Sequence, residues 1–151
     1  RSLDWHLTEY DFHKQLQQFV ADLNHPYQAE PALYQVDFSW AGVEWINFRD
    51  VDKSIIAFER RGVDPNQRLV VICNFTPVPR SGYRVGVPAA GFYTEILNSD
   101  AAAYGGSNLG NNGGLPSDPI PWDKRPHSIL VTLPPLGVVI FKTPLPESTD
   151  A

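Results

Sequence analysis

The sequence is poor in residues that would place it in several common protein classes. It has a single cysteine, Cys73, and no methionine. One thiol cannot form a disulfide within the chain, and it is too little for a cysteine-based metal site. Cys73 lies in the apolar run Leu69–Phe75, which predicts a small buried side chain on a strand. The missing methionine indicates that the chain does not begin at a translation start, so we expect a segment of a longer protein.

Grouped positive charge and long apolar runs are also missing. The net charge is -5, and lysine and arginine are scattered, which argues against a nucleic-acid partner because neutralising phosphates requires clustered cations. No apolar run approaches the roughly 20 residues that span a bilayer, and the chain opens without a signal-peptide pattern. A single thiol is compatible with a reducing compartment. We expect a cytoplasmic protein with neither nucleic acid nor membrane as partner.

The residue patterns of several catalytic classes are absent. There is no Gly-x-Ser-x-Gly motif, and the four histidines show no metal-ligand spacing. The Gly-rich stretch 105–114 lacks the Lys-Ser/Thr ending of a phosphate-binding loop. We therefore predict no metal and no cofactor. Glycosidic chemistry needs two carboxylates facing one bond. Six acids could serve, but spacing sets none apart, so solvated or ion-paired roles are favoured: Asp4, Glu9, Asp37, Glu44, Asp50 and Asp52.

What the sequence does contain is one amphipathic helix near its start. Asp11 is the predicted N-cap, and Asn24-His25-Pro26 is expected to end the helix. Five apolar residues recur at helical spacing between them: Phe12, Leu16, Phe19, Val20 and Leu23. Such a stripe must be buried against something. Either it lies on the strands that follow or its partner is absent from this chain, and we favour the second alternative.

After the helix the pattern changes to short apolar runs separated by Gly and Pro. These residues predict a mainly β fold, an antiparallel β-sandwich, with a boundary near residues 35–50. The long segment Ser99–Pro126 carries no strand signal and is typical of a functional or disordered loop. Six strands are predicted: Ser54–Arg60, Leu69–Phe75, Tyr83–Val87, Phe92–Leu97, Ile129–Leu133 and Gly137–Lys142.

The tryptophans are the most informative side chains for binding. All four fall in predicted loops or at boundaries: Trp5, Trp40, Trp45 and Trp122. Indole stacks on the flat C–H face of a sugar ring, while nearby carboxylates, amides and imidazoles bond its hydroxyls. The runs Asp4-Trp5-His6 and Trp40–Trp45 offer both. For Trp45, core packing and carbohydrate contact stay open; for Trp40 and Trp122, packing or plain surface exposure is favoured.

Several motifs are distributed over nearly the whole chain. They are Ser2–Leu7, Val20–Asn24, Asp37-Phe38-x-x-x-Gly42-x-Glu44-Trp45, Asn74-Phe75-Thr76-Pro77-Val78-Pro79-Arg80, Glu95–Asp100, Tyr104-x-Gly106-Ser107-Asn108-x-Gly110-Asn111 and Leu133–Leu136. In their residues and in their order these motifs resemble the bacterial glycogen (1,4-alpha-glucan) branching enzymes of the alpha-amylase superfamily. The sequence departs from the familiar pattern at Ser39-Trp40.

The resemblance implies an architecture. The family fold is a (β/α)8 barrel followed by a C-terminal β-sandwich, so residues 1–35 would be the final loop and helix of the barrel, and 36–151 the sandwich domain. The apolar stripe would then pack on a barrel that is not part of this sequence.

The resemblance also implies a reaction and a set of contacts. The family cleaves an alpha-1,4 glucan bond and transfers the chain to a 6-hydroxyl through a covalent glycosyl-enzyme intermediate. Its catalytic Asp–Glu–Asp set lies upstream of this sequence, so we expect no catalytic residue here. Trp45 matches a cleft-side tryptophan, and Asp4, Trp5 and His6 match a loop at the substrate face of the barrel. The expected partners are alpha-glucan and the barrel. A stand-alone carbohydrate-binding module and a structural β-domain of another alpha-amylase-family hydrolase are the alternatives.

Overall fold

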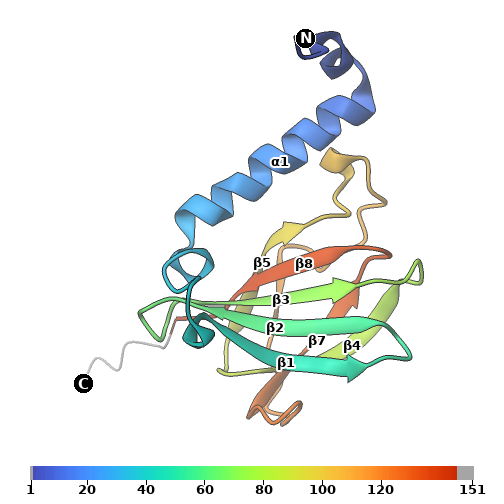
Figure 1. Cartoon of the computed structure of the whole chain (residues 1–151). Helices are drawn as coiled ribbons and strands as arrows, with labels where there is room; N and C mark the ends of the chain where they lie inside the picture. Colours follow the sequence, from blue (N-terminus) through green and yellow to red (C-terminus); the bar gives the residue numbers. More distant parts are fainter. Residues whose placement is uncertain (1, 146–151) are drawn as a thin grey trace.

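The computed structural model describes residues 2–145 and confirms a mainly β protein that begins with one α-helix (Figure 1). Arg1 of the predicted barrel segment and residues 146–151 of the predicted β-domain lie outside the described residues. The helix and strands are α1 (Asp11–Ala29), β1 (Val43–Asp50), β2 (Ile55–Arg61), β3 (Arg68–Asn74), β4 (Arg80–Val87), β5 (Phe92–Asn98), β6 (Gly114–Pro116), β7 (His127–Leu133) and β8 (Val138–Lys142). Four short 3-10 helices accompany them: η1 (Trp5–Glu9), η2 (Pro31–Leu33), η3 (Trp40–Gly42) and η4 (Ala102–Tyr104).

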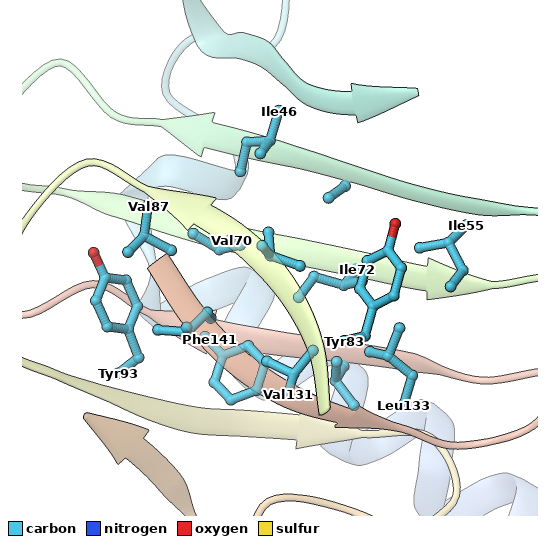
Figure 2. Close-up of a cluster of buried hydrophobic side chains, with 14 residues drawn as sticks. Ile46, Ile55, Val70, Ile72, Tyr83, Val87, Tyr93, Val131, Leu133 and Phe141 are labelled. Atoms are coloured by element: carbon cyan, nitrogen blue, oxygen red, sulfur yellow. The ribbon is translucent and has the colours of Figure 1, made fainter. Parts of the chain in front are cut away.

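The strands form two antiparallel sheets with the main core between them. One sheet has six strands in the order β1-β2-β3-β8-β5-β6, and the other pairs β4 with β7. Along the regular stretches of the strands, alternate residues point inward, as the period of two requires. Figure 2 shows Val70 and Phe141 of the larger sheet pointing into the same space as Tyr83 and Val131 of the smaller one. This inner face defines the sandwich that the sequence predicts.

The outer face of the larger sheet carries a second, smaller apolar cluster. Buried Leu69, Val71 and Ile140 lie there beneath Ala32 of η2, with Phe58 and Cys73 partly buried beside them. A groove of about 410 Å³, lined mainly by apolar side chains, remains between this face and the end of α1. The chain thus covers its outer face only in part.

The helix touches the β structure through few contacts. Phe19 packs against Tyr104 of η4 with ring centroids 5.1 Å apart, and the Tyr104 hydroxyl donates to Asp22 at 2.9 Å. At its other end, Lys142 of β8 donates to Glu30 at 2.7 Å. In Figure 1, α1 extends away from the sheets toward its N-terminus. The position of α1 therefore depends mainly on the loop that carries Tyr104 and on the ion pair between Lys142 and Glu30.

The apolar stripe of α1 stays largely in solvent. Phe19 is partly buried, but Phe12 is 83% exposed, and Leu16, Val20 and Leu23 are exposed as well. The strands in residues 2–145 therefore do not cover the stripe, which rules out the first of the two alternatives for this helix. No helix within the described residues combines the length and apolarity needed to cross a membrane.

Both predicted ends of the helix are wrong. Tyr10, not Asp11, occupies the N-cap position, and Asp11 is the first helical residue. The helix passes Pro26 and ends at Ala29. Pro26 lacks the N–H that would bond the Asp22 carbonyl, but the Pro26 carbonyl accepts from the Glu30 N–H at 2.8 Å and so closes the last turn of the helix.

The six predicted strands are confirmed with shifts of up to three residues, but two strands were missed. β6 has three residues and ends in a proline. β1 carries two irregularities of register, between Trp45 and Asn47 and between Asn47 and Asp50. Bulges disturb the alternation from which a strand is recognised. The placement of Trp45 in a loop or boundary is therefore corrected: Trp45 lies on an edge strand.

Candidate functional site

A groove of about 380 Å³ runs along β1, the edge strand of the larger sheet. One wall is the run Glu44–Arg49 of β1, and the other is Asp123–Arg125. The groove therefore joins two segments about 80 residues apart in the sequence. It contains Trp45, the side chain that the motif comparison singled out.

Trp45 is held from one side and open on the other. It pairs across the strands with Phe58, with ring centroids 5.7 Å apart and planes at 72°, and Phe48 lies 5.8 Å away. Ile46 points into the core, and Trp45, on the opposite face of the strand, remains 51% exposed. Edge-to-face packing of this kind fixes an indole in place. Trp45 is therefore partly packed and keeps an accessible aromatic surface, and carbohydrate contact at this residue stays a prediction.

The opposite wall is a tight turn in an uncommon conformation. Trp122 and Arg125 exchange backbone hydrogen bonds of 3.1 and 2.8 Å, while Asp123 and Lys124 between them have φ of 48° and 62°. This geometry is a type I′ turn, which usually takes Asn and Gly. Residues other than glycine adopt a positive φ where contacts with the surrounding structure stabilise that backbone conformation. The residues from Trp122 to Arg125 are called the 122–125 turn below.

The Asp123 carboxylate and a close backbone approach hold this turn. Asp123 accepts from the Gly86 N–H at 3.1 Å and from the Asn47 amide at 3.3 Å. Burial raises the pKa of Asp123, and these hydrogen bonds, with Arg125 nearby, offset only part of that rise. A Cβ at position 86 would collide with the carbonyl oxygen of Trp122, so the two backbones approach closely because Gly86 has none.

A network of charges joins the turn to β1, β2 and β3. Arg125 pairs with Glu44 at 2.8 Å and with Glu59 at 3.2 Å. Glu59 is completely buried and also pairs with Arg61 at 3.2 Å and Arg68 at 3.0 Å, while Arg61 reaches Glu44. A buried carboxylate needs such compensation. The network fixes the wall of the groove. Both carboxylates of the network, Glu44 and Glu59, are paired with arginines.

The groove presents an aromatic surface beside polar donors. Arg49 lies 5.4 Å from the centre of the Phe48 ring, and Lys124 is exposed at the tip of the turn. Within residues 2–145, neither cation forms an ion pair. No group of three His, Cys, Asp or Glu in that range could hold a metal ion. The arrangement is suited to hold a polyhydroxylated ligand against Trp45.

The other predicted site residues lie elsewhere. Trp5 and His6 belong to η1, with Asp4 at its N-cap position, and all three are exposed. η1 stands at the far end of α1 from the sheets, whereas β1 is at the opposite side of the molecule (Figure 1). The chain therefore does not bring Asp4, Trp5 and His6 to Trp45.

Sequence reasoning missed most of the groove. Phe48 and Arg49 follow Trp45 closely and could have been proposed from that proximity. Asp123, Lys124 and Arg125 carry no local signal, because their approach to β1 depends on the tertiary fold. The structure places Trp122 in the turn, 47% exposed, and Trp40 in η3, almost fully exposed.

The two packed sheets and the match of residues 45–144 to the family described as alpha amylase, C-terminal all-beta domain, show that the chain belongs to this family. It is homologous to the C-terminal domain of the 1,4-alpha-glucan branching enzymes GlgB, as the motifs predicted. It is 51% identical over 141 residues to GlgB of Aquifex aeolicus, covering 93% of this chain and 22% of the relative. To GlgB of Thermosynechococcus vestitus it is 50% identical over 140 residues, covering 93% and 18%. The chain thus spans about a fifth of the length of these curated relatives.

Proposed function

We propose that the chain is the C-terminal part of a cytoplasmic 1,4-alpha-glucan branching enzyme. In this proposal residues 1–35 are the last loop and helix of the catalytic barrel, and 36–151 form the accessory β-domain. The parent cleaves alpha-1,4 glucan and transfers the chain to a 6-hydroxyl, while this part supports the barrel and contacts glucan without carrying out the reaction. The identity to branching enzymes over 93% of the chain carries the proposal.

The uncovered stripe of α1 supports a partner on its apolar side. Fully burying an exposed side chain of this kind gains about 1.5–3 kcal/mol, and Phe12, which is more exposed than Leu16 and Val20, would gain the most of the three. The apolar groove between α1 and the outer sheet face adds to this surface. The occupant that we propose is the barrel of the same enzyme, because α1 belongs to the segment homologous to branching enzymes.

The Trp45 groove is the proposed glucan contact. Its volume of about 380 Å³ lies in the range usual for small-ligand sites. The exposed half of the indole offers a stacking surface, and Asn47, Arg49 and Lys124 offer donors for hydroxyls. Asp4, Trp5 and His6 are proposed to contact substrate separately, from the barrel side.

The test is a Trp45→Ala change in the full-length enzyme. Losing a stacking contact worth about 1 kcal/mol should raise the amylose concentration for half-maximal branching roughly fivefold and shift the branch-length profile. Trp40→Ala is the matched control, because Trp40 is also an exposed tryptophan but does not line the groove. Unchanged branching and chain lengths for Trp45→Ala would remove this residue from glucan handling.

The open aromatic groove also favours a second candidate, a carbohydrate-binding module that works without the barrel. Titrating the chain with maltoheptaose while following tryptophan fluorescence separates the two. Saturable binding that disappears in Trp45→Ala supports a module. No binding by the chain, together with a Trp45 effect in the full-length enzyme, means that the contact requires the barrel. If the chain is instead a structural domain of another alpha-amylase-family hydrolase, it should not bind maltoheptaose, and Trp45→Ala should not alter the activity of the full-length enzyme.

A further inference from the structure

We propose that the glucan track continues past the 122–125 turn, with Trp122 as a second stacking platform for the same chain of alpha-1,4-linked glucose units. This inference rests on the proposed function, since it extends the Trp45 groove. It assigns a binding role to a tryptophan for which the sequence favoured packing or plain exposure.

A second groove adjoins the first across the turn. Its volume is about 370 Å³, and Asp50, Lys53, Arg84 and Trp122 are among the residues that line it. Asn47 and Asp123 line both grooves. Their side chains are hydrogen-bonded to each other at 3.3 Å, so this polar pair forms the border that the two grooves share. In the proposed track a ligand longer than either groove crosses this polar border.

The position of Trp122 suits it for stacking. The turn that carries it is fixed by the Gly86 approach, by Asp123 and by the Arg125 ion pairs. Its indole is 47% exposed, next to the similarly exposed Leu130, and no aromatic ring of residues 2–145 packs on it. Because the backbone of the turn is already ordered, only the two side-chain torsions of Trp122 remain to be fixed when a ring stacks on its indole.

The charges of the second groove favour a neutral ligand. Two carboxylates, Asp50 and Asp123, face two cations, Lys53 and Arg84. Asp50 accepts from the Tyr83 hydroxyl at 2.8 Å and pairs with Lys53 at 3.6 Å, and Arg84 pairs with Asp118 at 2.9 Å. Because these charges balance within the protein, the groove has no excess charge for a phosphate or an acidic chain. Bonded carboxylates can still accept from sugar hydroxyls.

A continuous track predicts that affinity depends on ligand length. A short oligosaccharide occupies one hollow, whereas a longer one engages both tryptophans at once and binds more tightly. With an indole stacking contact worth about 1 kcal/mol, Trp122→Ala should weaken maltoheptaose binding roughly fivefold. Maltose, which spans one hollow, should lose its affinity for the Trp45 groove only when Trp45 is replaced.

The experiment is an NMR titration of the chain with its tryptophans labelled with nitrogen-15. The indole N–H signals of Trp45 and Trp122 are followed separately, and that of Trp40, which lines neither groove, is the internal control. Maltoheptaose should shift the Trp45 and Trp122 signals with one common Kd. Ile120→Ala is the matched variant, because Ile120 is exposed in the same segment but lines neither groove, and it should bind maltoheptaose as the unmodified chain does.

Each of the other outcomes would contradict a specific part of the proposed glucan track. A shift of Trp45 alone would refute the extension and leave the Trp45 groove standing. Two signals with different Kd values would mean two separate sites, which contradicts a continuous track. If neither signal moves, the chain alone has no glucan track and the extension fails, whereas a Trp45→Ala effect on branching in the full-length enzyme would still support a Trp45 contact that requires the barrel.

Discussion

Glu59 is the residue that most strongly joins the candidate site to the core. Its carboxylate is fully buried and faces Arg61, Arg68 and Arg125, which come from β2, β3 and the 122–125 turn. Without it, three guanidinium groups would face one another with only Glu44 to balance them. Uncompensated charge in a partly dry environment is costly.

We expect Glu59→Gln to lower the free energy of unfolding by about 3 kcal/mol, the low end for a broken buried pair, because the three arginines retain some solvent. Urea unfolding of the two proteins measures the difference. Glu44→Gln is the control: its carboxylate is much more exposed, so its loss should cost less than about 1 kcal/mol. Equal stability of Glu59→Gln and the unmodified chain would show that the network adds nothing to folding.

At the scale of the element, the 122–125 turn depends on a strand that is distant in sequence. Gly86→Ala should push the Trp122 carbonyl away and lower stability by about 1–3 kcal/mol. The same shift should weaken glucan binding, because both grooves share this turn. Ser81→Ala, at an exposed position of the same strand, should change neither quantity. Thermal unfolding and a maltoheptaose titration of both variants provide the comparison.

The Asp100 carboxylate anchors the first part of the loop after β5. Burial alone would raise the pKa of Asp100, but hydrogen bonds donated by Ser107 and Leu109 outweigh it and hold the pKa below its ordinary value of 3.8. A folded-state pKa below the unfolded one adds stability above about pH 4, and that stability is lost as the pH falls through the lowered value.

Asp100→Asn should therefore reduce stability at pH 7 and flatten its decline toward pH 2. Urea midpoints at several pH values test this. Since all other groups titrate alike in both proteins, the difference between the two curves reports Asp100. Parallel curves would show that the hydrogen bonds at Asp100 do not depend on its charge.

The elements that sequence could predict are those with an unbroken pattern. The run Leu69–Cys73 is continuously apolar, and β3 is accordingly a central, buried strand. β1 has bulges on both sides of Asn47, so its apolar side chains do not alternate. The 122–125 turn lacks the Asn-Gly pair that marks most type I′ turns, because contacts with Gly86, Asn47 and Glu59 replace the local preference. Trp45 was found through a motif, but the other wall of its groove exists only in the folded chain.

At the scale of the whole molecule, the structure consists of a packed sandwich and a helix held at few points. We expect the amides of the first turns of α1 to exchange with solvent much faster than those of β3 and β8, because the helix has no buried residue. Hydrogen exchange followed by mass spectrometry measures both regions in one experiment. In the full-length enzyme the same helix should become protected. Strong protection of α1 in the monomeric chain would contradict the proposed barrel contact.

Cys73 lies half-buried on the outer face of the larger sheet, between Ile56 of β2 and Val138 of β8. Burial raises the pKa of its thiol, so little reactive thiolate is present at neutral pH. Because the sequence has no other thiol, a sulfhydryl reagent such as a maleimide dye would attach at one known position without engineering. The rate at which the dye attaches then measures how often the sheet surface around Cys73 becomes accessible to solvent. The same measurement can be made in a longer protein whose remaining cysteines have been replaced.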